Sequence, residues 1–502
     1  MTPGHARRAD GHVPFVVVVA ALIVSAVAVG SVLGGVTRAS RPSRGLGPAA
    51  DPAVPINGVF SGLTTFRGNA SRTYLGEGPL PVDPVVRWRY PTDGSKLCSQ
   101  STEGRDGSPL KEWCGTGWTG QPNLVPLGDG MELREGTYDA SYHFVDAGTG
   151  AEVRPPLQTG DLAKGSATSD PDGYPLYYGG SRDDKLRIVA LDRPEPTVLW
   201  ELDATTSVER PLWNDDWDGA PLVIGDSLLV GGENGWFYVI DLNRGYSDDG
   251  RVTVDPTYVA FPGFDDELLA AIGDEDVSIE SSPAFRDGVV YFANSGGLVQ
   301  GWDISDLLAG GSDYQRVFRF WTGDDTDATV VIDPDGSLYV ASEFQRFGDR
   351  SRSLGQLMKL DPAAADPVVW SLPAAETGFE DAGGSWSTPA LYGDRVFFTT
   401  AAGRVLAVDR ATGAITWEAQ IGAPAIGSPV VVGGTLVQGD CSGHLYAWDV
   451  ADPLATPTLS WRMDLGDCIE STPAAWKGWL FVGTREGYVY GVADRDTPAP
   501  TP

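Results

Sequence analysis

The chain has 502 residues, and its 36 Lys and Arg against 68 Asp and Glu give a formal net charge of −32. A surface this acidic repels nucleic-acid phosphates and anionic lipid headgroups, which argues against nucleic-acid binding and against peripheral membrane binding by the folded part. With 42% hydrophobic and 21% charged residues the chain is expected to be globular, and its 64 Gly and 37 Pro suit a fold with many tight turns.

The first predicted element is a transmembrane signal-anchor helix at residues 13–36. Phe15–Val36 contains no charged residue, and at about 1.5 Å per residue it is long enough to cross a hydrocarbon core of roughly 30 Å. A cleaved signal peptide is the alternative, but its apolar region would be only about 7–15 residues long. We therefore predict a short cytoplasmic tail at residues 1–12 and, after the helix, a Pro/Ala-rich tether at residues 37–60. The arginines that flank the helix do not fix its orientation.

One phrase recurs in the body of the chain, residues 61–495: a small residue and Pro, an apolar strand, a turn and a second apolar strand. A third strand that ends in Asp and a fourth that carries Trp complete each unit. Eight units of four short strands are typical of an eight-bladed β-propeller, so we predict an all-β fold of this kind. The clear copies are Ser282–Phe292, Thr388–Phe398, Ser428–Gly434 and Thr472–Gly478, and weaker ones start near Gln121, Ser166, Ala220 and Ala328.

The ends of the repeat predict how the ring closes. The last unit stops after its third strand at Asp494, and an orphan Trp-bearing strand, Val85–Tyr90, precedes the first unit. We expect this strand to complete the last blade, which removes an exposed sheet edge. Within the repeats, only Asp265–Gly273 and Ser305–Gly310 are predicted to be helical, and residues 496–502 are predicted to be a disordered tail.

These repeats, together with the preceding segment Thr65–Thr73, resemble the PQQ-binding-like propeller superfamily, which includes quinoprotein alcohol dehydrogenases and the outer-membrane assembly lipoproteins. The resemblance covers about residues 61–495 and implies the fold rather than an activity. The dehydrogenases carry an adjacent Cys-Cys pair that packs on the quinone, and some carry a Cys-x-x-Cys-His haem site. Neither occurs here, so the chain is more similar to the assembly lipoproteins, and no cofactor is expected.

The four cysteines fall into two pairs on one face of the predicted ring. Cys98 and Cys114 share a connection from a fourth strand to the next first strand, while Cys441 and Cys468 lie in neighbouring connections of adjacent blades. We predict the disulfides Cys98–Cys114 and Cys441–Cys468, with four free thiols as the alternative. Disulfides indicate an oxidising compartment. The chain is therefore predicted to be a single-pass plasma-membrane protein with an extracytoplasmic propeller.

Candidate ligand-binding residues lie three positions before the Pro that opens a first strand, where a side chain is expected to face the central channel. They are Glu280, Glu470, Asp218 and Trp386. Together they suggest an acidic funnel for a cation or a polar ligand, with an aromatic platform. The alternative is a structural role, with these side chains solvated or bonded to backbone amides. The acidic runs Asn214–Asp218 and Asp324–Asp327 match no defined calcium loop, and we interpret them as solvated loops.

Two functional hypotheses follow. The first is a non-catalytic binding or scaffold module for a protein, a glycan or a small ligand. The second is an enzyme that depends on PQQ or a cation such as Ca²⁺ and uses the acidic funnel. The first is favoured because the chain has only four histidines, of which His143 and His444 lie on predicted strands. The sequence therefore offers too few histidines for a His-activated nucleophile or a zinc site.

Overall fold

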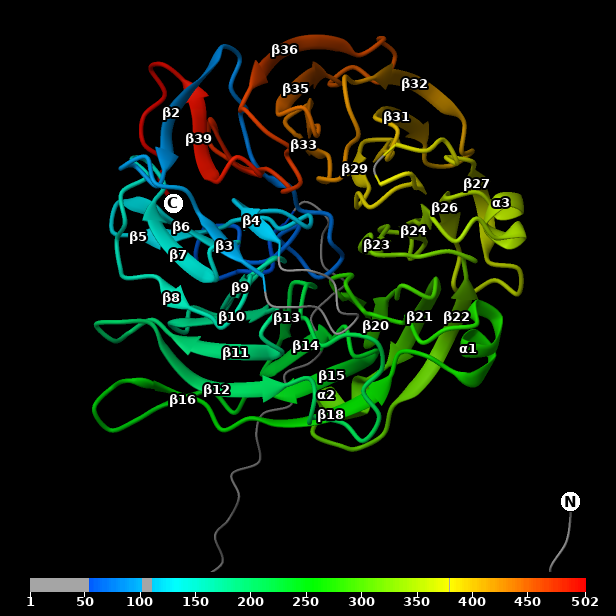
Figure 1. Ribbon diagram of the computed structural model, residues 1–502, viewed down its shortest axis with the longest axis horizontal. Helices are drawn as coiled ribbons and strands as arrows, with labels where there is room; N and C mark the ends of the chain where they lie inside the picture. Colours follow the sequence, from blue (N-terminus) through cyan, green and yellow to red (C-terminus); the bar gives the residue numbers. More distant parts are fainter. Residues whose placement is uncertain (1–53, 102–110, 379) are drawn as a thin grey trace, which may run out of the picture. The chain divides into compact units, whose positions relative to one another are not determined.

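Figure 1 shows the computed structural model of the protein, which describes residues 54–101, 111–378 and 380–502. All of these belong to one unit of the chain, residues 44–502. The predicted cytoplasmic tail, the predicted membrane helix and most of the predicted tether lie outside the described residues. Within the described ranges, no helix is both long and apolar enough to cross a bilayer.

Eight antiparallel sheets surround a central axis, which confirms the predicted eight-bladed propeller (Figure 1). Blades 1 to 3 are β5–β8 (Asn123–Leu127, Gly130–Thr137, Ser141–Asp146, Leu157–Gln158), β9–β12 (Thr168–Ser169, Leu176–Ser181, Lys185–Ala190, Thr197–Asp203) and β13–β15 with β18 (Leu222–Ile224, Ser227–Gly231, Trp236–Asp241, Thr257–Pro262). Blades 4 and 5 are β19–β22 (Ala284–Arg286, Val289–Phe292, Leu298–Asp303, Gln315–Trp321) and β23, β24, β26 and β27 (Val331–Ile332, Leu338–Ala341, Leu357–Leu360, Val368–Leu372). Blades 6 to 8 are β29–β32 (Ala390–Tyr392, Arg395–Thr399, Arg404–Asp409, Ile415–Gln420), β33–β36 (Val430–Val432, Thr435–Gly439, His444–Asp449, Thr458–Asp464) and β37–β39 with β2 (Ala474–Trp476, Trp479–Thr484, Tyr488–Asp494, Pro84–Tyr90).

The burial of each strand follows from its place in the blade. The second strand of blade 3, β14, is buried along its whole length, because neighbouring blades cover both of its faces. The outermost strand of blade 4, β22, alternates instead: Phe318 and Phe320 point inward and their neighbours are more exposed. The hydrophobic core is accordingly divided into clusters that each join neighbouring blades.

The ring closes as the sequence predicts. β2 pairs antiparallel with β39, from Pro84 opposite Asp494 to Tyr90 opposite Val489. The Asp494 carboxylate also accepts hydrogen bonds from the backbone N–H groups of Val82 (3.0 Å) and Asp83 (2.7 Å). The short strand β1 (Gly76–Glu77), which was not predicted, pairs parallel with the inner strand β37.

The segment Thr65–Thr73 lies inside the ring and ties blades together. Arg67 and Arg72 are fully buried in it. Arg67 Nη2 donates to the carbonyl of Thr388 in blade 6 (2.6 Å), and Arg72 Nε donates to the carbonyl of Pro283 at the start of blade 4 (2.8 Å). The backbone carbonyls of Thr64, Ala70 and Ser71 accept hydrogen bonds from first strands of blades 2, 4 and 5. We call residues 64–73 the plug segment.

A belt of hydroxyl groups joins the inner ends of the blades. In six places, the residue two positions before a first strand donates its backbone N–H to the hydroxyl of the equivalent residue in the next blade. Ser282, for example, donates to Thr329 Oγ1 (2.9 Å), and Thr329 donates to Thr388 Oγ1 (3.0 Å). The belt defines equivalent positions in all blades: Gln121, Ser166, Ala220, Ser282, Thr329, Thr388, Ser428 and Thr472.

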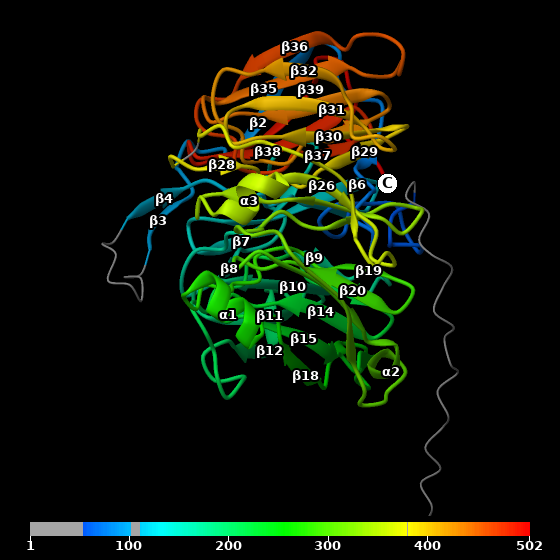
Figure 2. The same ribbon diagram turned by 90° about the vertical axis from the view of Figure 1, so that its right-hand side faces the viewer.

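Several long insertions gather toward one side of the ring. Figure 2 shows on this side the hairpin β3–β4 (Cys98–Gln100, Glu112–Cys114) and the helices α1 (Asp266–Ile272) and α3 (Asp349–Leu354). The short sheet of β25 (Glu343–Phe344) and β28 (Gly383–Gly384) also connects loops of two blades, and β16 (Gly245–Tyr246) pairs with β17 (Val252–Thr253) in an insertion of blade 3. The predicted helices are confirmed as α1 and α2 (Ser305–Leu308), whereas α3 was not predicted.

The C-terminal residues 496–502, whose composition predicts a disordered tail, lie against blade 8. The indole N–H of Trp479 donates to the carbonyl of Pro498 (2.8 Å), and that of Trp476 donates to the carbonyl of Thr501 (3.0 Å). A Pro-rich segment has few backbone donors of its own. Its carbonyls remain available as acceptors, and here two buried tryptophans supply the donors.

Candidate functional site

The hydroxyl belt aligns the channel positions of all eight blades, two residues before each belt residue. The four predicted residues occupy equivalent positions in this alignment. Two further charged residues, Lys164 and Asp327, were missed because blades 2 and 5 have no Pro after the belt residue. Counting back from Ser166 and Thr329 would have identified both. The eight channel positions are Thr119, Lys164, Asp218, Glu280, Asp327, Trp386, Ile426 and Glu470.

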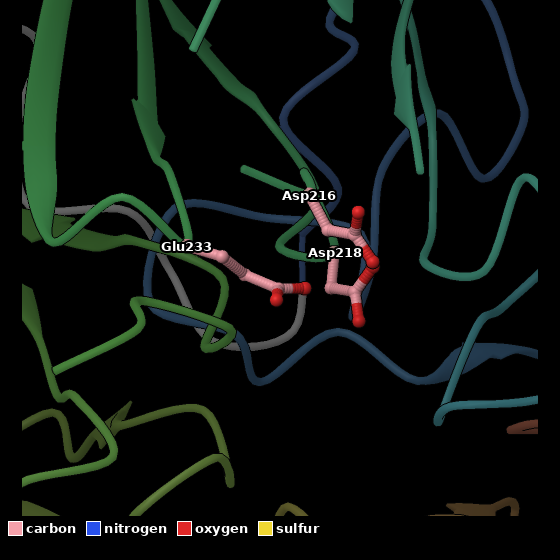
Figure 3. A group of neighbouring side chains, drawn as sticks. All are labelled: Asp216, Asp218 and Glu233. Atoms are coloured by element: carbon pink, nitrogen blue, oxygen red, sulfur yellow. The ribbon is translucent and has the colours of Figure 1, made fainter. Parts of the chain in front are cut away.

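Asp218 belongs to a buried cluster that surrounds a lysine. Figure 3 shows the carboxyl groups of Asp216, Asp218 and Glu233 turned toward one another. Lys164 Nζ lies 3.0 Å from Asp216 Oδ2, 2.8 Å from Asp218 Oδ2 and 3.4 Å from Glu233 Oε1. Burial raises the pKa of Asp216 to about 6 and that of Glu233 well above its usual value, although Lys164 opposes both shifts. We call these four residues the lysine cluster.

A second group of three carboxyls lies in blade 5. One oxygen from each of Asp325, Asp327 and Glu343 lies within 4.8 Å of the others. Gln345 Nε2 donates to Asp325 Oδ2 (2.6 Å), but both carboxylate oxygens of Glu343 are buried and accept no hydrogen bond from a group outside the three. Burial, reinforced by the neighbouring carboxyls, raises the pKa of all three groups well above their usual values. We call them the blade 5 cluster.

The interpretation of the two acidic runs as solvated loops is wrong. Asp216 and Asp218 are 2% and 5% exposed, and Asp324 and Asp325 are 0% and 5% exposed. The physical reason lies in the topology: both runs are connections from a fourth strand to the next first strand, and these connections turn inward to the channel. Composition alone does not distinguish such a connection from an outer loop.

Glu280 is held by a tryptophan that the sequence analysis did not single out. Trp118 Nε1 donates to Glu280 Oε2 (2.5 Å), and Lys164 Nζ lies 5.6 Å from the centre of the Trp118 ring. Trp118 and Thr119 have φ angles of 49° and 57°, a strained conformation for residues other than glycine. Burial and the nearby Asp327 and Asp218 raise the pKa of Glu280 well above its usual value.

Glu470 and Trp386 also lie in the interior, but in different surroundings. Glu470 Oε1 accepts a hydrogen bond from Arg485 Nη1 (2.9 Å), and burial still raises the pKa of Glu470. A Cβ at Gly117 would lie 2.3 Å from Glu470 Oε2 and 2.5 Å from the Tyr138 hydroxyl, so a larger residue here would displace one of these side-chain ends. Trp386 is 6% exposed and packs in an apolar cluster that includes Ile426 and Cys468, with Trp118 against it.

Both predicted disulfides are formed, and they border the same cavity. Cys98–Cys114 joins the strands of the hairpin β3–β4, and Cys441–Cys468 joins blades 7 and 8. The cavity has a volume of about 410 Å³. It is lined by Glu112, Cys114, Cys441, Asp467, Cys468, Glu470 and Arg485. A larger cavity of about 740 Å³ lies elsewhere, beside residues 54–62 and Trp476.

Comparisons with known proteins agree with this architecture. The family described as outer membrane protein assembly factor BamB matches residues 353–454. The matched segment contains the last two strands of blade 5, all of blade 6 and the first three strands of blade 7. No curated protein matches the sequence significantly.

Solved structures of the PQQ-like propellers share the fold at low sequence identity. BamB from Moraxella catarrhalis is 18% identical with a TM-score of 0.51, over 74% of this chain and 95% of that chain. A quinohemoprotein alcohol dehydrogenase from Comamonas testosteroni is 12% identical with a TM-score of 0.55, over 87% of this chain and 82% of that chain. Identities this low establish the fold alone, so an activity must be argued from the site.

Proposed function

We propose that this chain is a membrane-anchored, extracytoplasmic propeller that binds a protein partner through its loop-rich face and carries out no quinone chemistry. The uncharged stretch Phe15–Val36 supports the anchor. Two disulfides support an oxidising compartment. Propellers of this superfamily include proteins named assembly factors, and the loops of a rigid scaffold are a common place for recognition.

The observation that carries the proposal is the cavity bordered by both disulfides. Its walls come from the hairpin β3–β4 and from the connections of blades 7 and 8, and the covalent links hold these loops in place. A preorganised surface loses little conformational entropy on binding. The ion pair of Glu470 with Arg485 supplies polar groups for orientation, and exposed Glu112 lies at the rim.

The residues of the channel do not fit PQQ, a planar tricarboxylate. Four of the eight channel positions carry carboxyl groups (Asp218, Glu280, Asp327 and Glu470), which supply no positive charge to pair with the carboxylates of the ligand. The cations that contact channel-position carboxyls are already engaged, Lys164 in its cluster and Arg485 with Glu470. The Trp118 side chain, from the connection before blade 1, contacts Glu280 of blade 4. It therefore takes up space in the channel that the planar quinone would need.

A second candidate function is cation-dependent catalysis in the acidic channel. One observation favours it: desolvation raises the pKa of the half-buried Glu280 well above its usual value, and a carboxyl group of this kind is suited to proton transfer. Glu280 also accepts a hydrogen bond from Trp118, and this contact gives the side chain a structural role that requires no catalysis. The binding role therefore remains the better supported of the two.

Site-directed photo-crosslinking on the full chain in its own membrane tests the proposed function. A crosslinking residue at Glu112, on the rim of the cavity, should give a discrete adduct with one protein. The control is Val317, which is 50% exposed on β22, the outer strand of blade 4, and more than 100 residues from every cysteine in the sequence. No adduct at position 112, or the same adducts at both positions, would overturn the proposed binding face.

A further inference from the structure

The lysine cluster and the blade 5 cluster are two copies of one arrangement. Asp218 and Asp327 occupy equivalent channel positions, and Asp216 and Asp325 each lie two residues earlier. Glu233 and Glu343 each follow their second strand, β14 or β24, by two residues. The backbone N–H of Glu233 donates to the carbonyl of Asp216 (3.0 Å), and that of Glu343 donates to the carbonyl of Asp325 (2.8 Å). The same backbone framework therefore presents three carboxyls in both blades.

The two copies differ in the charge that faces them. In blade 3 the channel position of the preceding blade is Lys164, whose ammonium group lies within 3.4 Å of all three carboxyls. In blade 5 the channel position of the preceding blade is Glu280, which adds a negative charge. The nearby guanidinium of Arg346 pairs instead with Asp274 (2.6 Å) and Asp276 (3.3 Å). Among the described residues, no lysine or arginine forms an ion pair with the blade 5 cluster.

Glu343 provides a second and independent indication that the blade 5 cluster has a ligand. Its side chain is 1% exposed and directed into the cluster, and neither carboxylate oxygen accepts a hydrogen bond from a group outside it. Its only side-chain hydrogen-bond partner is the Asp327 carboxyl of the same cluster. Buried polar groups are almost always satisfied, and one left without a partner costs about 1–3 kcal/mol or more when it is charged. A ligand that accepts electron pairs from these oxygens would remove that cost.

We propose that Asp325, Asp327 and Glu343 bind a Ca²⁺ ion at the place that Lys164 Nζ has in the blade 3 copy. All the available ligand atoms are oxygens, which Ca²⁺ prefers, and their spacing of up to 4.8 Å suits ligands on one ion at about 2.3–2.6 Å. Mg²⁺ is less suitable because it demands a tighter octahedral shell and keeps several waters. This binding site uses no quinone and is independent of the proposed partner.

The competing explanation is that the three carboxyls are protonated and share their protons. Their raised pKa values agree with it as long as no cation is present. Protonated carboxyls would not take up Ca²⁺ at neutral pH. A direct binding measurement therefore separates the two explanations.

The experiment is isothermal titration calorimetry of CaCl₂ into the purified full chain in detergent, after removal of divalent ions with a chelator. We expect one site per chain at pH 7. Glu343→Gln should weaken binding at least tenfold. Glu233→Gln, the matched change in the lysine cluster, should leave the affinity within about twofold, because Lys164 already fills that copy.

Two substitutions at channel positions keep the proposal testable even if Glu343→Gln perturbs the fold. Lys164→Met removes the built-in cation of the lysine cluster and should raise the stoichiometry from one Ca²⁺ to two. Glu280→Lys should place an ammonium group beside the blade 5 cluster and abolish binding. Absence of binding to the folded wild-type chain at millimolar Ca²⁺ would overturn the proposal. Equal loss of binding in Glu233→Gln and Glu343→Gln would overturn it as well.

Discussion

Replacing Arg72 with methionine tests whether the plug segment holds the blades together. The guanidinium is fully buried and meets no carboxylate. It donates to the carbonyls of Pro283 (2.8 Å), Phe66 (2.7 Å) and Ala220 (3.3 Å) and to Thr65 Oγ1 (3.0 Å). Methionine is of similar length and apolar, so it fills the space but leaves these acceptors without a donor.

The magnitude follows from these contacts. A hydrogen bond to a charged group contributes about 1.5–3 kcal/mol, so four of them stabilise the fold by about 6 kcal/mol or more. The burial that lowers the pKa of Arg72 to about 9 offsets part of this, because the charged form is costly to desolvate. We expect Arg72→Met to lower the free energy of unfolding by about 3–5 kcal/mol, in the range of the most destabilising single changes.

Urea denaturation of the full chain, followed by tryptophan fluorescence, measures this change. Arg87→Met is the control, because Arg87 donates to the carbonyls of Asp494 (2.8 Å) and Thr497 (3.0 Å) at the exposed rim. It should cost about 0.5 kcal/mol or less. A loss below 1 kcal/mol for Arg72→Met would refute the reasoning, because the plug segment would then not be a structural tie.

Three further predictions concern single features of the fold. Burial raises the pKa of Glu135, so stability falls as the pH rises above about 4.5 and through the folded pKa. In urea titrations Glu135→Gln should therefore be about 1–3 kcal/mol more stable than wild type at pH 7 and equal to it at pH 4, and a difference independent of pH would contradict this. Thr388→Val removes the acceptor of the Thr329 N–H and should cost about 1–3 kcal/mol by thermal melting, whereas Thr388→Ser should restore most of the loss. Replacing both Cys441 and Cys468 with serine should cost about 3–4 kcal/mol by urea denaturation, since the bond closes a loop over a separation of 27 residues; a loss under 1 kcal/mol would speak against a restrained loop.

Much of the fold could be predicted because all eight blades have the same packing requirements, so the same sequence pattern recurs in each of them. Small residues before each first strand meet at the crowded channel, and apolar strands of period two pack between blades. The orphan strand Val85–Tyr90 was identified by the same logic, since a unit without a fourth strand leaves an open edge. The plug segment and β1 were not predicted, because each occurs once. A single buried arginine such as Arg72 has no sequence signal that separates it from an exposed one.

The candidate site was predicted only in part, for a related reason. Asp218 and Glu280 were found by their distance from Pro, but the true marker is the belt residue, which a Pro need not follow. Lys164 and Asp327 were missed for that reason. The contact of Trp118 with Glu280 joins residues 162 positions apart. This contact depends on the path of one connection across the channel, and no local sequence pattern predicts that path.

The most direct test of the proposed function is a titration of PQQ into the full chain at saturating Ca²⁺, followed by calorimetry and by the absorbance of the quinone. The account predicts no saturable binding, because the channel is acidic, its cations are engaged and Trp118 contacts Glu280. Saturable, Ca²⁺-dependent binding of PQQ that is lost in Glu280→Gln would contradict it, and would assign the channel to a quinone enzyme instead.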